Sequence, residues 1–205
     1  MSLTLVVKID DDQIRFMKRQ GYDLFLAKLV QGQAKANVIW KSKSAYIDSN
    51  TFQWQPVFAI AGSEDVKPGA VVSALTKVKS IGYGQLIEIN KDGAITDATN
   101  PVDPGKPFRI TNRDSEADFA AAVYSVDPAN PEAELSNPFF ISKSLVEDLT
   151  LDILPLETVV LWFGAHQETS TVIADYSGDI LTVVYGEGES AHTAKWTKAG
   201  WQLVH

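Results

Sequence analysis

Short runs of β-forming residues, separated by turn residues, follow one another along most of this chain. Val, Ile, Thr and aromatic residues dominate the runs, and Gly, Asn, Asp and Pro interrupt them roughly every ten residues, the spacing typical of an antiparallel β-sandwich or barrel. We therefore expect an all-β protein with an antiparallel β-sandwich architecture. The main predicted strands are 22–30, 34–41, 70–81, 85–93, 108–111, 119–126, 149–154, 158–163, 170–176, 179–186 and a closing hairpin over 192–204.

One short helix is predicted over residues 10–20, near the N-terminus. Asp10 and Gln13 have the spacing of a capping box, so we expect Asp10 to cap the helix. Acidic residues in the first turn and basic residues in the last complement the helix dipole. Gly21 follows as a stop signal.

The segment 101–106 divides the chain into two halves. It lies within the Pro- and Gly-rich stretch 99–107, which is the most linker-like part of the sequence. We expect a β-rich half over 1–100 that includes the helix, and a β-rich acidic half over 107–205. Weak similarity between their strand patterns suggests that the halves are related, and they form either two domains or one compact body.

Charge and composition exclude several classes of function. The net charge is −8, which makes general nucleic-acid binding unfavourable because phosphate contacts need clustered Lys and Arg. No apolar run is long enough for a transmembrane helix. There is no cysteine and no basic leader before the first apolar run, so we expect a cytoplasmic protein, with leaderless release as an alternative.

The sequence contains no recognisable catalytic or nucleotide-binding motif. The alternating acids Asp114, Glu116 and Asp118 could offer oxygens to a hard cation, but a solvated turn is the preferred interpretation. His166 follows an apolar strand and has no evident nucleophile nearby in the sequence. We accordingly predict no catalytic residue, no metal site and no cofactor.

Aromatic residues are the best functional clue. The stretch FQWQPVF, residues 52–58, places Phe52, Trp54 and Phe58 on one face of a strand, which we expect to be mainly core. Tyr46 lies in a polar segment and is expected to be exposed. The predicted ligand-binding residues are Tyr46, Trp54, Trp196 and Trp201.

The preferred function is non-catalytic recognition of carbohydrate or lipid head groups through loops that carry aromatic residues. The observation behind it is aromatic richness without a catalytic constellation. In composition and class the chain is also similar to cytoplasmic lectins and small membrane-active defence proteins of fungi and bacteria. Two alternatives stay open at this point. One is a pore-forming cytolysin, and the other is a glycan hydrolase that uses two dispersed carboxylates. An oligomer is compatible with each.

Overall fold

Strands dominate the structure, a computed structural model that describes residues 2–64, 67–125, 137–165, 167–176 and 178–204. The described residues contain one helix, so the all-β prediction is confirmed. The predicted loop 127–138, apart from its last two residues, and His166 lie outside the described residues. The elements are β1 (Leu3–Ile9), α1 (Asp11–Arg19), β2 (Asp23–Val30), β3 (Lys41–Lys43), β4 (Ser49–Trp54), β5 (Phe58–Ser63), β6 (Lys79–Ile81), β7 (Leu86–Ile89), β8 (Phe108–Asn112), β9 (Phe119–Ser125), β10 (Pro138–Leu145), β11 (Thr150–Ile153), β12 (Pro155–Gly164), β13 (Ile180–Val184), β14 (Ala191–Thr197) and β15 (Gly200–Val204).

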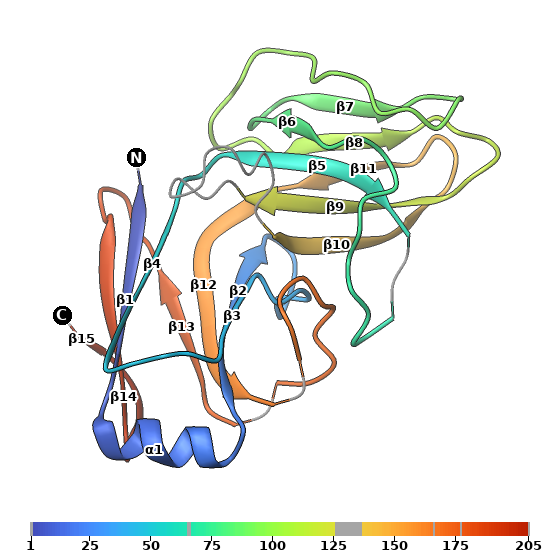
Figure 1. Ribbon diagram of the computed structural model, residues 1–205. Helices are drawn as coiled ribbons and strands as arrows, with labels where there is room; N and C mark the ends of the chain where they lie inside the picture. Colours follow the sequence, from blue (N-terminus) through green and yellow to red (C-terminus); the bar gives the residue numbers. More distant parts are fainter. Residues whose placement is uncertain (1, 65–66, 126–136, 166, 177, 205) are drawn as a thin grey trace.

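The strands form four sheets in two groups (Figure 1). Sheets β15-β14-β1-β4 and β13-β12-β2-β3 lie together with α1, and sheets β10-β9-β5-β6 and β11-β8-β7 lie above them in the view of Figure 1. Most neighbouring strands are antiparallel, whereas β1 with β14 and β7 with β8 are parallel. This is a sandwich-like arrangement with two parallel contacts that the sequence pattern did not reveal.

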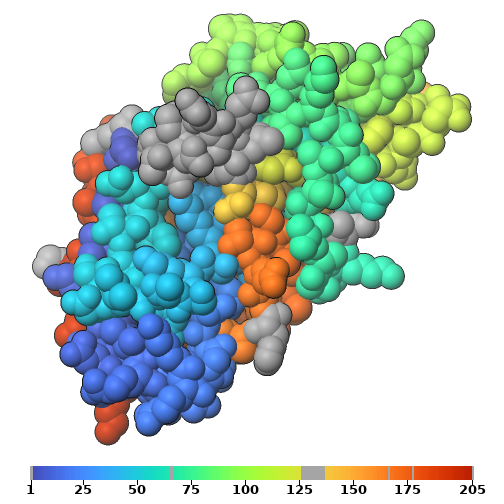
Figure 2. Space-filling model, viewed as in Figure 1, coloured from blue at the N-terminus to red at the C-terminus, as the bar shows by residue number. Residues whose placement is uncertain are grey.

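Each sheet takes strands from both predicted halves of the chain. For example, β1 pairs with β14, and β2 pairs with β12. Segments from the two halves of the chain therefore adjoin on the face shown in Figure 2, where its blue and orange parts meet. The stretch 101–106 connects strands of one interleaved fold and does not separate two sets of sheets.

Helix α1 forms where it was predicted, but its N-terminus differs from the expectation. Asp10 is the N-cap residue and makes no side-chain capping hydrogen bond. Its Oδ1 lies 3.0 Å from Nζ of Lys195 on β14 instead. The capping-box prediction is therefore wrong, because an ion pair to a neighbouring strand holds the carboxylate. Met17 is buried and Ile14 packs against the core, so this stripe of the helix faces the body.

Three predicted strands are largely irregular segments that bond to one another. Residues 34–41, 70–81 and 170–176 contain apolar side chains in strand-like patterns, but they pair mainly through isolated bridges such as Val38 with Val172 and Val71 with Thr171. Only the short strands β3 and β6 include part of them. Their buried valines cover a sheet face without joining a ladder, so the apolar pattern indicated burial rather than strand pairing.

The aromatic stripe of β4 and β5 lies in the core. Phe52, Trp54 and Phe58 are buried, as the alternation in the sequence predicted. Tyr46 is also fully buried, so its predicted exposure is wrong. Its hydroxyl donates a hydrogen bond to the carbonyl oxygen of Tyr22 at 3.0 Å, which gives the one polar atom of this ring a partner inside the fold.

Candidate functional site: an aromatic pocket beside Asp179

Phe163, near the end of β12, brings together three of the four aromatic residues that were predicted to bind ligand. The ring centroids of Tyr46, Trp196 and Trp201 each lie 5.4 Å from that of Phe163. Trp201 stacks on Phe163 with an interplanar angle of 9°, whereas Tyr46 meets its edge at 68°. The loop and the closing hairpin therefore contribute to one aromatic cluster, although they are far apart in the sequence.

Strand pairing fixes this arrangement. The closing hairpin places Trp196 opposite Trp201 in the register of β14 and β15, and their rings lie 4.9 Å apart. The hairpin turn ends at Gly200, which has a φ of 95°. A side chain at Gly200 would be strained at this angle and would also crowd the Asp179 carboxylate, which lies 3.2 Å from an ideal Cβ position.

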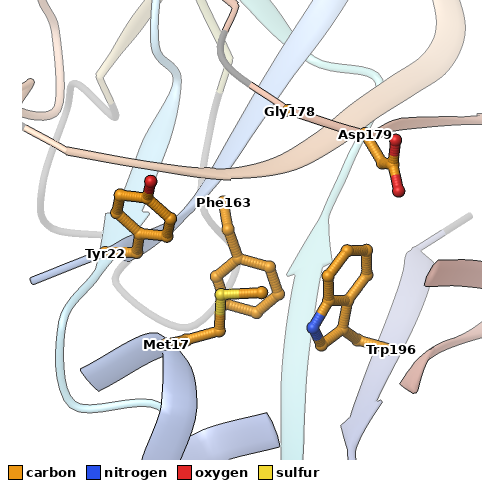
Figure 3. A pocket seen from close by; sticks show the side chains of 6 residues that line it. All are labelled: Met17, Tyr22, Phe163, Gly178, Asp179 and Trp196. Atoms are coloured by element: carbon orange, nitrogen blue, oxygen red, sulfur yellow. The ribbon is translucent and has the colours of Figure 1, made fainter. Parts of the chain in front are cut away.

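A small cavity of about 80 Å³ adjoins the cluster (Figure 3). Helix α1 contributes one wall, the turn before β2 a second, and β12 and β14 the aromatic walls. The segment before β13 forms the exposed rim. The lining residues are Met17, Tyr22, Phe163, Gly178, Asp179 and Trp196.

The charge of the cavity comes from Asp179. This side chain is exposed at the rim, and the indole Nε1 of Trp201 donates a hydrogen bond to the backbone oxygen of Asp179 at 3.1 Å. In the described part of the chain, no lysine, arginine or histidine forms an ion pair with the Asp179 carboxylate. The carboxylate therefore lies at the exposed rim, 3.2 Å from an ideal Cβ position on Gly200, without an ion-pair partner from those residues.

Trp196 adds a buried donor. The residue is 8% exposed, and its Nε1 finds no hydrogen-bond acceptor among the described residues. Figure 3 shows this nitrogen on the edge of the indole that is turned toward Met17 and Phe163. The indole nitrogens of Trp40 and Trp162 are unpaired among the described residues as well, and that of Trp196 is the one that borders this cavity. Buried donors without a partner are uncommon in native proteins, so a ligand that accepts from Trp196 would satisfy it.

Trp54, the fourth predicted ligand-binding residue, lies elsewhere. It is fully buried and forms part of a second aromatic cluster around Lys28 on β2. The Lys28 Nζ lies 5.1–5.7 Å from the centroids of four rings, those of Trp40, Trp54, Phe58 and Phe139. We call this group the Lys28 cage. Trp54 is therefore a core residue and does not reach the pocket surface.

The Lys28 cage holds a cation away from water. Lys28 is fully buried, and its Nζ has no hydrogen-bond partner among the described residues. Burial lowers its pKa to about 8; the negative charge of Glu157 opposes this change, and Lys41 adds to it. Cation–π attraction to the surrounding rings compensates for part of the lost hydration. The chain thus uses an aromatic cage to hold an ammonium group.

The described residues contain no group of three or more His, Asp or Glu side chains placed to hold a metal ion. Asp114 is buried, and its Oδ1 accepts the backbone N–H of Glu116 at 2.8 Å, the geometry of a local turn. No helix in the same part of the chain is long and apolar enough to cross a membrane.

Comparisons with protein-family models, with curated proteins and with solved structures find no match for this chain. The case for a function therefore depends on the pocket itself.

Sequence reasoning missed Phe163, Met17, Tyr22 and Asp179 as members of the site. Phe163 lies in an apolar run that predicts a core strand. Asp179 is the first residue of a predicted strand in the acidic half of the chain. Neither has a local signal for binding, because the cavity is lined by five segments that are mostly far apart in the sequence. The one usable clue was aromatic residues in the closing hairpin.

Proposed function

We propose that this chain is a non-catalytic recognition protein, lectin-like in binding its ligand without chemical change, and that it binds a small head group of a glycan or lipid. The observation that supports this most strongly is the convergence of Tyr46, Trp196 and Trp201 on Phe163 beside a cavity with an exposed rim. Aromatic faces provide contact area for sugar rings and for apolar or cationic head groups. The lining supplies Asp179 as a polar contact at the rim.

The size of the cavity favours recognition of one group of a larger ligand. A volume of about 80 Å³ is well below the roughly 300–1,000 Å³ typical of sites that enclose a whole small molecule. The remainder of the ligand would extend past the exposed rim at Gly178 and Asp179 into solvent. This is the geometry expected for a terminal sugar or a lipid head group.

A glycan array and sedimentation with dye-loaded vesicles test the proposal. The wild-type protein should bind at least one glycan or one vesicle composition, without releasing the dye. Trp201→Ala should lose this binding, because the half-buried Trp201 supports Phe163 and holds the rim. Phe16→Ala is the matched control, since Phe16 is an aromatic residue that is 45% exposed on α1 and does not line the cavity.

Absence of wild-type binding to every glycan and every vesicle would refute the proposal. Dye release on binding would favour the pore-forming alternative instead. Equal loss of binding in Phe16→Ala and Trp201→Ala would show that the pocket is not the site.

A further inference from the structure

We infer that the ligand group held by the aromatic pocket is an organic ammonium cation, of the quaternary type found in choline. This inference depends on the proposed function and specifies the ligand for the same site. It follows from the charge of the rim, from the nature of the walls, and from the way in which the same chain holds an ammonium group in its interior.

Asp179 supplies the electrostatic part of the recognition. Among the described residues that line the cavity, it is the one with a formal charge, and those residues give it no ion-pair partner. Trp201 donates to the backbone oxygen of Asp179, which holds this part of the backbone at the rim of the cavity. A negative charge at the rim attracts a cation and disfavours anionic head groups such as phosphate alone.

The walls suit a cation that has no hydrogen atoms to donate. Phe163 and Trp196 present aromatic rings, and Met17 adds a polarisable thioether. A sugar needs several hydrogen-bond partners for its hydroxyl groups. Apart from the buried Nε1 of Trp196, the described lining residues offer two polar side chains, Asp179 and Tyr22. A methylated ammonium group makes no such demand, and it interacts with ring faces through its charge. An oxygen elsewhere on the ligand, such as the choline hydroxyl, would accept the hydrogen bond that the unpaired Nε1 of Trp196 can donate.

The Lys28 cage is an internal precedent for this chemistry. There, four aromatic rings surround an ammonium group that has no hydrogen-bond partner in the described residues. In the pocket, the described residues offer rings and a carboxylate but no cationic side chain in ion-pair contact with Asp179. The Lys18 Nζ lies 5.3 Å from the centroid of Tyr46, a ring of the cluster that does not line the cavity. A ligand ammonium group would complete the pocket as the Lys28 side chain completes the cage.

Isothermal titration calorimetry with choline chloride tests the inference against a neutral compound of the same shape. The neutral probe is 3,3-dimethyl-1-butanol, in which carbon replaces the quaternary nitrogen, and sodium chloride keeps the ionic strength equal. Choline should bind at least about tenfold more tightly than the alcohol. Asp179→Asn should remove this difference. Asp175→Asn should preserve it, because Asp175 is an exposed acid on the same segment that does not line the cavity.

The outcomes separate this inference from the proposed function. Equal affinity for choline and the alcohol, or choline affinity unchanged in Asp179→Asn, would overturn the cation assignment and leave the recognition function in place. Glycan binding without choline binding would do the same. Failure of choline, glycans and vesicles together would overturn both. Preference for phosphatidylcholine vesicles over phosphatidylglycerol vesicles would identify a lipid as the source of the cation, whereas binding of free choline alone would identify a soluble one.

Discussion

Two aromatic clusters in this molecule differ in where their charge comes from. The Lys28 cage is closed, and its cation belongs to the chain, whereas the pocket beside Phe163 has an exposed rim and a carboxylate at its edge. Both are built on neighbouring strands of one sheet, since β2 pairs with β12. The same types of residue thus produce a structural centre in one place and a candidate binding site in the other.

Aromatic content alone therefore does not identify a binding site. Burial and the sign of the accompanying charge make the distinction. The rings of the cage already interact with the Lys28 ammonium group, which has lost its hydration by burial. The cage therefore has no free ring face for an external ligand. A carboxylate at the exposed rim, without an ion-pair partner among the described residues, can attract a cationic ligand.

Replacing a ring of the cage should destabilise the fold without altering the pocket. Trp54→Ala should lower the free energy of unfolding by about 3–5 kcal/mol, the usual cost of removing a buried Trp. Trp201→Ala should cost less, since this side chain is only partly buried. Urea denaturation measures both variants, and choline titration of the folded protein should find near-normal affinity in Trp54→Ala only. Loss of choline affinity in folded Trp54→Ala would show that the two clusters are not independent.

The Lys28 cage should also make stability depend on pH. The pKa of Lys28 is about 8 in the folded protein and near 10.5 when exposed, so the unfolded chain holds the extra proton between these values. Stability should therefore rise as the pH increases from 8 to 9, by about 1 kcal/mol, before tyrosines in the unfolded chain lose their protons. Lys28→Met should remove this rise and should stabilise the protein at neutral pH. Chemical denaturation at a series of pH values provides the measurement.

The opposite trend is expected above pH 10. Burial raises the pKa of Tyr46 and of Tyr83 to about 12, with smaller contributions from Asp23 and Glu157, so the folded protein keeps these phenols protonated when the unfolded chain loses the protons. Stability should fall as the pH rises past 10 in both the wild type and Lys28→Met. A flat profile from pH 8 to 9 in the wild type would contradict the assignment of Lys28 as a buried cation.

A smaller effect is expected where the pocket meets the core. Tyr46→Phe keeps the ring that supports Phe163 but removes the hydrogen bond to the carbonyl oxygen of Tyr22. The free energy of unfolding should fall by about 1 kcal/mol, and choline affinity should change by less than about twofold. Denaturation and calorimetry check the two values. A tenfold weaker affinity would mean that the hydroxyl itself contacts the ligand.

The fold class could be predicted from the sequence because period-two patterns and turn residues are local signals. The helix, the closing hairpin and the buried stripe of β4 and β5 followed from them. The same signals failed at 34–41 and 70–81, where apolar residues cover a sheet without pairing as regular strands. Burial and strand pairing produce similar sequence patterns, and the pairing partner lies far away in the chain.

The site was only partly predictable. Trp196 and Trp201 were identified because two tryptophans in a hairpin are visible in the sequence, but their contact with Phe163 depends on long-range packing. Tyr46 was placed outside because its neighbours are polar, although one buried ring can lie within a polar segment. Lys28 gave no signal, since a lysine in an apolar strand usually extends to solvent.

The most direct test of the account compares the indole N–H signals of all five tryptophans in one ¹H–¹⁵N NMR titration with choline chloride. Trp196 and Trp201 belong to the pocket cluster, Trp40 and Trp54 to the Lys28 cage, and Trp162 to a separate apolar cluster. We expect saturable chemical-shift changes for the Trp196 and Trp201 signals and unchanged chemical shifts for the other three. Shifts of the Trp40 and Trp54 signals, or no saturable shift at any indole, would contradict the account.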